Sequence, residues 1–260
     1  MKKTSTLILL LIFFFCSNAQ KNIYSALTIP DSLKKDADVV IREENIKLNI
    51  KDKNSASYQV QQVITVLNEQ GKKFLSFVQC ADKFHTLDDA EIKVYDLLGN
   101  KKQAYTKKEM ASLNYGEGLV PEGKITYFNV NAAAYPITVE FTYRIKFKGI
   151  FSLPGYNMQA PWQAVQHSIF EIEVPADLGV RYKLLNTVKQ PDIIHNGSKD
   201  VYKWELKNMK AYSLEKHSGS PYSYEPTVLI GPNKFKLDDY DGDMTSWKNF
   251  GAWIDNLYAK

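Results

Sequence analysis

The residues best suited to covalent chemistry are two cysteines and four histidines. Cys80 follows the apolar run Phe74–Val78, and His85 comes shortly after it. A thiolate activated by a neighbouring imidazole would be a nucleophile for acyl transfer. Such a cysteine needs a lowered pKa, which a helix N-terminus commonly supplies, whereas Cys80 stands at the end of a predicted strand. We therefore expect Cys80 to be structural, and part of a cysteine hydrolase is an alternative interpretation.

Acidic residues gather around Gly242 and invite comparison with a calcium-binding loop. They are Asp238, Asp239, Asp241 and Asp243. An EF-hand loop with Gly242 in its sixth place would need ligands where Leu237 and Lys248 stand. The histidines show no metal-ligand spacing, and no Gly-rich phosphate loop or nucleophile elbow is present. The sequence predicts no metal site, no cofactor and no catalytic residue.

Aromatic side chains offer binding chemistry instead. Exposed Tyr and Trp rings can stack on a sugar or clamp an extended peptide. The candidates in Pro- and Gly-containing loops are Tyr156, Trp162, Tyr222 and Tyr224, and those of a C-terminal helical stripe are Trp247, Phe250 and Trp253. We take these seven as candidate ligand or partner contacts. The alternative for the loop aromatics is that they close the rim of the core.

The N-terminus is typical of a secretory signal peptide. Lys2 and Lys3 precede the apolar run Leu7–Phe15, and small residues allow a cut at Ala19-Gln20. That run is too short to span a bilayer as a helix. We expect residues 1–19 to be removed, the protein to be exported to the periplasm or cell envelope, and no permanent membrane anchor to remain. Cys80 is then the only cysteine, so no internal disulfide can form.

Composition and periodicity predict an all-β fold. The chain of 260 residues has 16 Tyr and 13 Phe, a bias typical of strands. Apolar and polar residues alternate over Ile137–Phe147 and in several shorter runs, which indicates strands with one buried face. Asn196-Gly197 predicts a hairpin turn, and 110–135 is expected to be a long loop or an excursion between sheets. We predict an antiparallel β-sandwich over residues 20–237.

Residues 238–260 are expected to form a linker and an amphipathic helix. Apolar residues recur at steps of three and four from Met244 to Leu257, and Asp243 or Thr245 could cap the start. The apolar stripe needs a surface to cover it, either on the sandwich itself or on a following domain absent from this chain. The net charge of +4 comes from scattered basic residues, which excludes a nucleic-acid-binding face.

The second half of the chain resembles the DUF3857 family of exported Bacteroidota proteins over roughly residues 50–260. The resemblance rests on the order of short motifs, which are 138–143 (TVEFTY), 170–175 (FEIEVP), 202–208 (YKWELKN), Leu214-Glu215, 225–228 (EPTV) and 246–251 (SWKNFG). It implies a β-sandwich of unassigned role that commonly precedes a transglutaminase-like domain with a Cys-His-Asp triad. No residue of this chain matches that triad.

These observations predict a non-catalytic exported module. In this interpretation the sandwich docks on, or presents substrate to, a transglutaminase- or protease-like domain, in cis or in trans. An independent glycan- or peptide-binding module is the main alternative.

Overall fold

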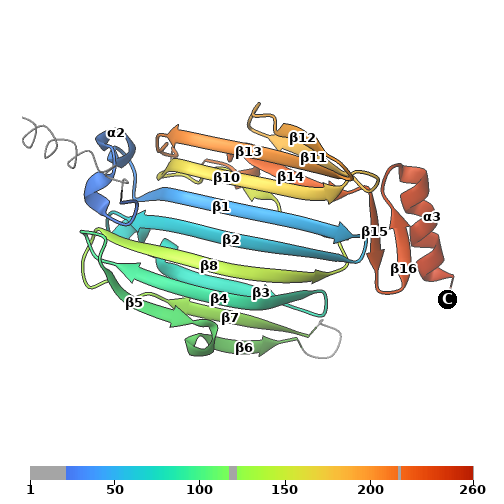
Figure 1. The fold of residues 1–260 in the computed structure, drawn as a ribbon, viewed down its shortest axis with the longest axis horizontal. Coiled ribbons are helices and arrows are strands. Elements are labelled where there is room, and N and C mark those ends of the chain that lie inside the picture. Colours follow the sequence, from blue (N-terminus) through green and yellow to red (C-terminus); the bar gives the residue numbers. More distant parts are fainter. Residues whose placement is uncertain (1–21, 117–121, 216–217, 260) are drawn as a thin grey trace, which may run out of the picture.

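The computed structural model describes residues 22–116, 122–215 and 218–259, so the predicted signal peptide lies outside the described residues. Its first layer is one sheet of eight strands in the order β12-β13-β10-β1-β2-β8-β4-β5 (Figure 1). Their bounds are β1 Val39–Asp52, β2 Ser55–Val66, β4 His85–Tyr95, β5 Lys101–Thr106, β8 Ile137–Lys148, β10 Gln163–Pro175, β12 Asp192–Asn196 and β13 Lys199–Met209.

Neighbouring strands of this sheet run antiparallel, as predicted, except at its centre. There β1 and β10 are parallel, with Val39 opposite Gln163 and Asn49 opposite Glu173. A parallel pair cannot be joined by a tight turn, and more than a hundred residues separate these two strands in the chain. The predicted hairpin at Asn196-Gly197 is confirmed, because it joins β12 to β13 with Gly197 at a φ of 60°.

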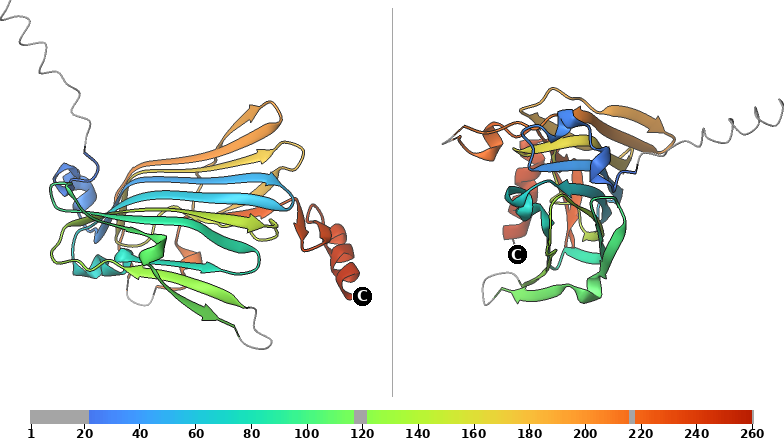
Figure 2. Two further views of the ribbon diagram at one scale, coloured as in Figure 1. Left: turned by 60° about the horizontal axis from the view of Figure 1, so that its bottom comes forward. Right: turned by 90° about the vertical axis from the view of Figure 1, so that its left-hand side faces the viewer.

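The second layer consists of two three-stranded sheets that cover the same face of the large sheet (Figure 2). One is β3-β7-β6 (Ser76–Ala81, Gly123–Asn129, Ala111–Tyr115) and the other is β11-β14-β9 (Val180–Leu185, Thr227–Pro232, Tyr156–Asn157). Phe77 of β3 stacks on Phe141 of β8, and Tyr182 of β11 meets Trp204 of β13 edge-on. The predicted β-sandwich is therefore confirmed. Of the two possibilities for 110–135, the structure shows an excursion between sheets and not a long loop, because β6 and β7 lie within this segment and belong to the covering sheet.

Alternation along the strands builds the core between these layers. Ile46, Leu48 and Ile50 of β1 are buried, whereas Lys47 and Asn49 between them face the other way. Phe170 and Trp204 are fully buried on neighbouring strands, with ring centroids 5.7 Å apart. Burying each such side chain contributes roughly 1.5–3 kcal/mol, so the core of the sandwich needs no disulfide.

Short helical turns close one end of the sandwich over a buried arginine. These are η2 (Ala26–Thr28) and α2 (Asp31–Lys34). Arg42 lies at a bulge in β1 and is fully buried. Its guanidinium donates to the backbone oxygen of Ser25 at 2.8 Å, to Thr28 Oγ1 at 2.7 Å and to Gln166 Oε1 at 2.9 Å. Burial lowers the pKa of Arg42 to about 10, and the three bonds tie the N-terminal turns to the sheet.

The C-terminal segment projects from the opposite end (Figures 1 and 2). It comprises the hairpin β15 (Lys234–Leu237) and β16 (Tyr240–Asp243), followed by α3 (Trp247–Tyr258), which confirms the predicted helix. Ser246 caps α3 by accepting a hydrogen bond from the Asn249 N–H, whereas Asp243, one of the expected caps, accepts instead from Thr245. None of the helices in the described part of the chain has the length and apolar character needed to span a bilayer.

Candidate interaction site

The hairpin β15–β16 holds α3 through an aromatic cluster. Trp253 is only 5% exposed and lies edge-on to Phe235 at 4.9 Å and against Phe151 at 5.6 Å. Phe235 in turn occupies the space above Gly242, its partner across the hairpin. The structure therefore shows that one face of α3 packs on this same chain, which was one of the two interpretations left open by the sequence.

Another face of α3 is left uncovered by residues 22–116, 122–215 and 218–259. Trp247, in its first turn, is 89% exposed, and Tyr258, in its last turn, is 85% exposed. A groove of about 370 Å³ runs beside the first turn and is lined by Arg181, Met244, Trp247 and Phe250, together with Thr245 and Ser246. A single exposed tryptophan is unremarkable on a surface, but one beside an apolar groove is typical of a contact point.

The groove is lined mainly by apolar side chains, with one cation, Arg181, at its rim. The Arg181 guanidinium donates to the backbone oxygen of Met244 and lies 3.1 Å from its sulfur. The groove can therefore accept an apolar or aromatic side chain of a partner and place a carbonyl or carboxylate near Arg181. The two lining hydroxyls are engaged at the start of α3, where Thr245 donates to Asp243 and Ser246 accepts from the Asn249 N–H, so the arrangement supports binding.

The four loop aromatics differ in exposure and in what they contact. Tyr156 belongs to β9, is 2% exposed and stacks on Phe170, so it packs in the core and is not available to a ligand. Trp162 is 38% exposed at a φ of 57°, Tyr222 is 74% exposed, and Tyr224 is partly buried. No ring contact joins any two of these four within the described ranges, so the structure does not assemble them into one stacking platform.

The thiol and the imidazoles are also kept apart. Cys80 is exposed on β3, because its parity along β3 is opposite to that of the buried Phe77. The His85 ring is 2.9 Å from Asp82 and lies edge-on to Phe147, and His195 bonds Asp200. Among the described residues, no hydrogen bond links Cys80 to a histidine, and no cluster of His, Cys, Asp and Glu could hold a metal ion. His217 lies outside the described residues.

The core contains a polar cluster that was not predicted from the sequence. Glu44 is 7% exposed and accepts hydrogen bonds from Gln62 and Ser168, whose hydroxyl is 2.6 Å from that of Tyr156. Burial raises the pKa of Glu44, although both hydrogen bonds oppose the shift. The sequence does contain a signal for this cluster. Glu44 lies two residues before Ile46, and Ser168 lies two residues before Phe170, so each has the parity of a buried apolar residue. Both are on the buried face, where a carboxylate is unexpected.

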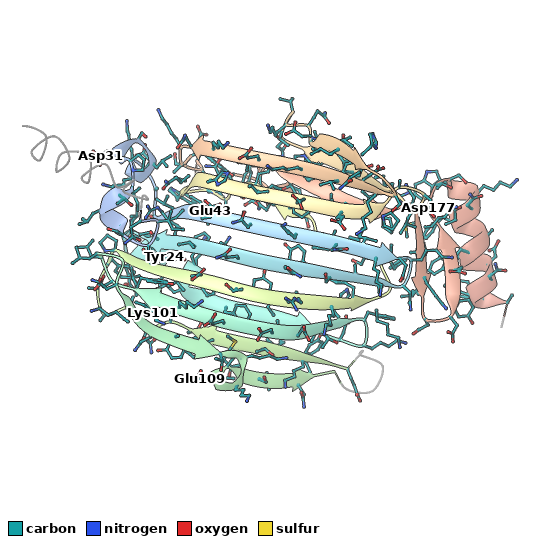
Figure 3. All side chains as sticks on the ribbon, viewed as in Figure 1. Tyr24, Asp31, Glu43, Lys101, Glu109 and Asp177 are labelled. Carbon is teal, nitrogen blue, oxygen red and sulfur yellow. The ribbon has the colours of Figure 1, made fainter. Side chains whose placement is uncertain are left out.

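A second polar feature lies on the uncovered face of the large sheet. A trough of about 470 Å³ crosses β1, β2, β8 and β4 and is lined by alternating cations, carboxylates and amides. Lys93 lies 2.8 Å from Glu91 and 3.8 Å from Glu140, which also accepts from Gln61. Further along this face, each ring nitrogen of His167 is 2.9 Å from a carboxylate oxygen, one of Glu43 and one of Glu205. Glu43 is marked on β1 in Figure 3.

Solved structures show how this architecture recurs. A candidate protease from Parabacteroides distasonis matches with a TM-score of 0.62 at 12% identity, over 74% of this chain and 40% of that one. At this identity the likeness shows the fold alone, and this chain spans two fifths of the length of that protein. A candidate nutrient-binding protein from Legionella pneumophila also matches, over 86% of this chain and 80% of that one, but its TM-score of 0.34 at 9% identity carries no argument. No protein with a curated description matches the chain.

The fold and the open helix face thus define a β-sandwich module with a projecting helix and no evident catalytic centre in its described part. Residues 52–213 match the DUF3857 family, which is described as a domain of unknown function with a solved structure. Because this match covers more than half of the sequence, the chain belongs to the DUF3857 family, as its motifs predicted.

Proposed function

We propose that this chain is an exported, non-catalytic module that docks on, or presents substrate to, a transglutaminase- or protease-like domain. The observation that carries the proposal is the open face of α3, where Trp247 is 89% exposed beside an apolar groove. The candidate protease supports it, because a sandwich of this fold there occupies only part of a longer chain. The opposite face of α3 is fixed by Trp253 and Phe235, so the open face is presented rigidly.

The test mixes this chain with a transglutaminase-like domain that carries a Cys-His-Asp triad. Binding should shield Trp247 from acrylamide quenching, and Trp247→Ser should weaken binding at least tenfold, as the loss of a buried aromatic contact does. Val188→Ser is the matched control, because Val188 is 92% exposed in a loop away from α3. A domain that does not bind, or that binds the Trp247→Ser variant as tightly as the original chain, would refute the proposal.

The trough on the uncovered face favours a second candidate function, independent binding of a glycan or an extended peptide. Its cations and carboxylates balance, and its amides offer both donors and acceptors, which suits a polar ligand without net charge. A glycan and peptide array would separate the candidates. This function requires a hit that Arg144→Ala in the trough weakens and Trp247→Ser leaves unchanged.

A further inference from the structure

The outer face of the covering sheet β3-β7-β6 is apolar, and no other described part of the chain packs on it. Its residues are set by the pairing registers, in which Val78 lies opposite Tyr127, and Cys80 opposite Ile125. On the other side of β7, Leu113 lies opposite Ile125, and Ala111 opposite Tyr127. Since these positions share one parity, their side chains project together, away from the large sheet.

Exposure confirms that this face meets solvent. Leu113 is 60% exposed, Val78 53%, Tyr127 39% and Tyr115 37%, and Cys80 is exposed as well. By contrast, Phe77, which projects from the other side of the same sheet, is 4% exposed. We call these exposed residues, with Ala111 and the half-buried Ile125 between them, the outer face: Val78, Cys80, Ala111, Leu113, Tyr115, Ile125 and Tyr127.

The outer face is also flat. Gly123 lies opposite Tyr115 across the strand pair, and a Cβ on Gly123 would fall 2.3 Å from Cζ of the Tyr115 ring. The ring therefore lies across the glycine instead of standing up from the sheet. A flat apolar patch of this kind is uncommon on a monomeric protein and marks an interaction surface.

We propose that the outer face is the contact between two copies of this chain. None of its residues is charged, so two identical faces can meet without repulsion, whereas the solvent-facing positions of most other strands carry Lys, Glu or Asp. The single cysteine also favours a contact between two copies. In a chain trimmed at the predicted signal-peptide cleavage site, Cys80 is the only thiol, and a lone exposed cysteine in an exported protein is commonly a site of pairing between chains.

The approximate size of the outer face indicates how closely the two copies meet and how tightly they bind. Three strands make a face roughly 10 Å wide, with stacked sheets about 10 Å apart, so a two-fold axis through the middle of the face places the two copies of Cys80 about 10–15 Å apart, within reach of a bis-maleimide cross-linker. The face is smaller than the roughly 800 Å² per partner of a stable complex. We therefore expect the self-association to be weak and transient.

The experiment uses the chain from Gln20 onward, because every described contact lies beyond that residue. Sedimentation velocity over a concentration series should show a dimer, and a short bis-maleimide should cross-link it through Cys80. Leu113→Lys should weaken the dimer at least about tenfold and abolish cross-linking, since it buries a charge in the contact. Leu98→Lys is the matched control, because Leu98 is 57% exposed in the turn between β4 and β5.

A cross-linking control places the only cysteine elsewhere. In the double variant Cys80→Ser with Val188→Cys, cross-linking should fall to the level of random collision. A chain that stays monomeric at high concentration, or a dimer that Leu113→Lys leaves intact, would overturn the proposal. Protection of Cys80 that appears only when a catalytic domain is joined to the chain would assign the face to that domain and would also overturn it.

Discussion

Gly242 is the position at which one added methyl group should release α3 from the sandwich. In Gly242→Ala the new Cβ would lie 2.1 Å from Cζ of Phe235 and 2.4 and 2.6 Å from the two Cε atoms. The Phe235 ring cannot retreat, because it is fully buried between Trp253 at 4.9 Å and Phe151 at 5.0 Å. Overpacking of this kind costs roughly 1–3 kcal/mol. With three ring atoms overlapped, we expect about 3 kcal/mol.

Urea unfolding and acrylamide quenching of tryptophan fluorescence would measure this effect. Gly242→Ala should unfold the C-terminal segment at lower urea and expose Trp253, which is shielded in the original chain. Gly251→Ala is the control, since nothing lies within 4 Å of a Cβ added there on α3; it should stabilise the helix by about 0.5–1 kcal/mol. The reasoning is refuted if Gly242→Ala retains the original unfolding midpoint and leaves Trp253 shielded.

Three further predictions concern charged groups that the fold holds. Arg42→Ala should cost about 3 kcal/mol in chemical unfolding, because three hydrogen bonds to a buried cation are lost; an unchanged midpoint would contradict this. At His167, burial favours the neutral ring, but hydrogen bonds to Glu205 and Glu43 outweigh it and raise the pKa. The stabilisation that the charged His167 ring contributes should be complete below the ordinary pKa of about 6.5, and it should be lost as pH rises through the folded value. His167→Asn should therefore destabilise the protein more at pH 5.5 than at pH 8.5. An equal loss of stability at both pH values would count against this prediction. Burial raises the pKa of Glu44, so its contribution is likewise greatest below its ordinary pKa and falls as pH rises; Glu44→Gln should flatten the stability–pH curve, and a curve parallel to the original would exclude this role.

Alternation of apolar and polar residues determined much of the fold in advance. The parity of Ile46, Leu48 and Ile50 fixes which face of β1 is buried, and the same rule applies to β10, β13 and the second half of β8. In the first half of β8 both faces are buried, including Thr138 and Glu140. The steps of three and four between Trp247 and Leu257 likewise fixed α3. These are local properties, because each strand or helix presents its own apolar face whatever its partner.

Long-range pairing decided the rest. Whether Cys80 is buried or exposed depends on which face of β3 meets the large sheet, and the parallel pairing of β1 with β10 joins segments far apart in the chain. The convergence of Glu44, Gln62 and Ser168 needs three strands in one register. Trp253 and Trp247 stand on one helix with the same apolar character, yet only the position of Phe235 makes the first a core residue and leaves the second open. No local pattern contains that information, because burial is a property of the assembled layers and not of a single strand or helix.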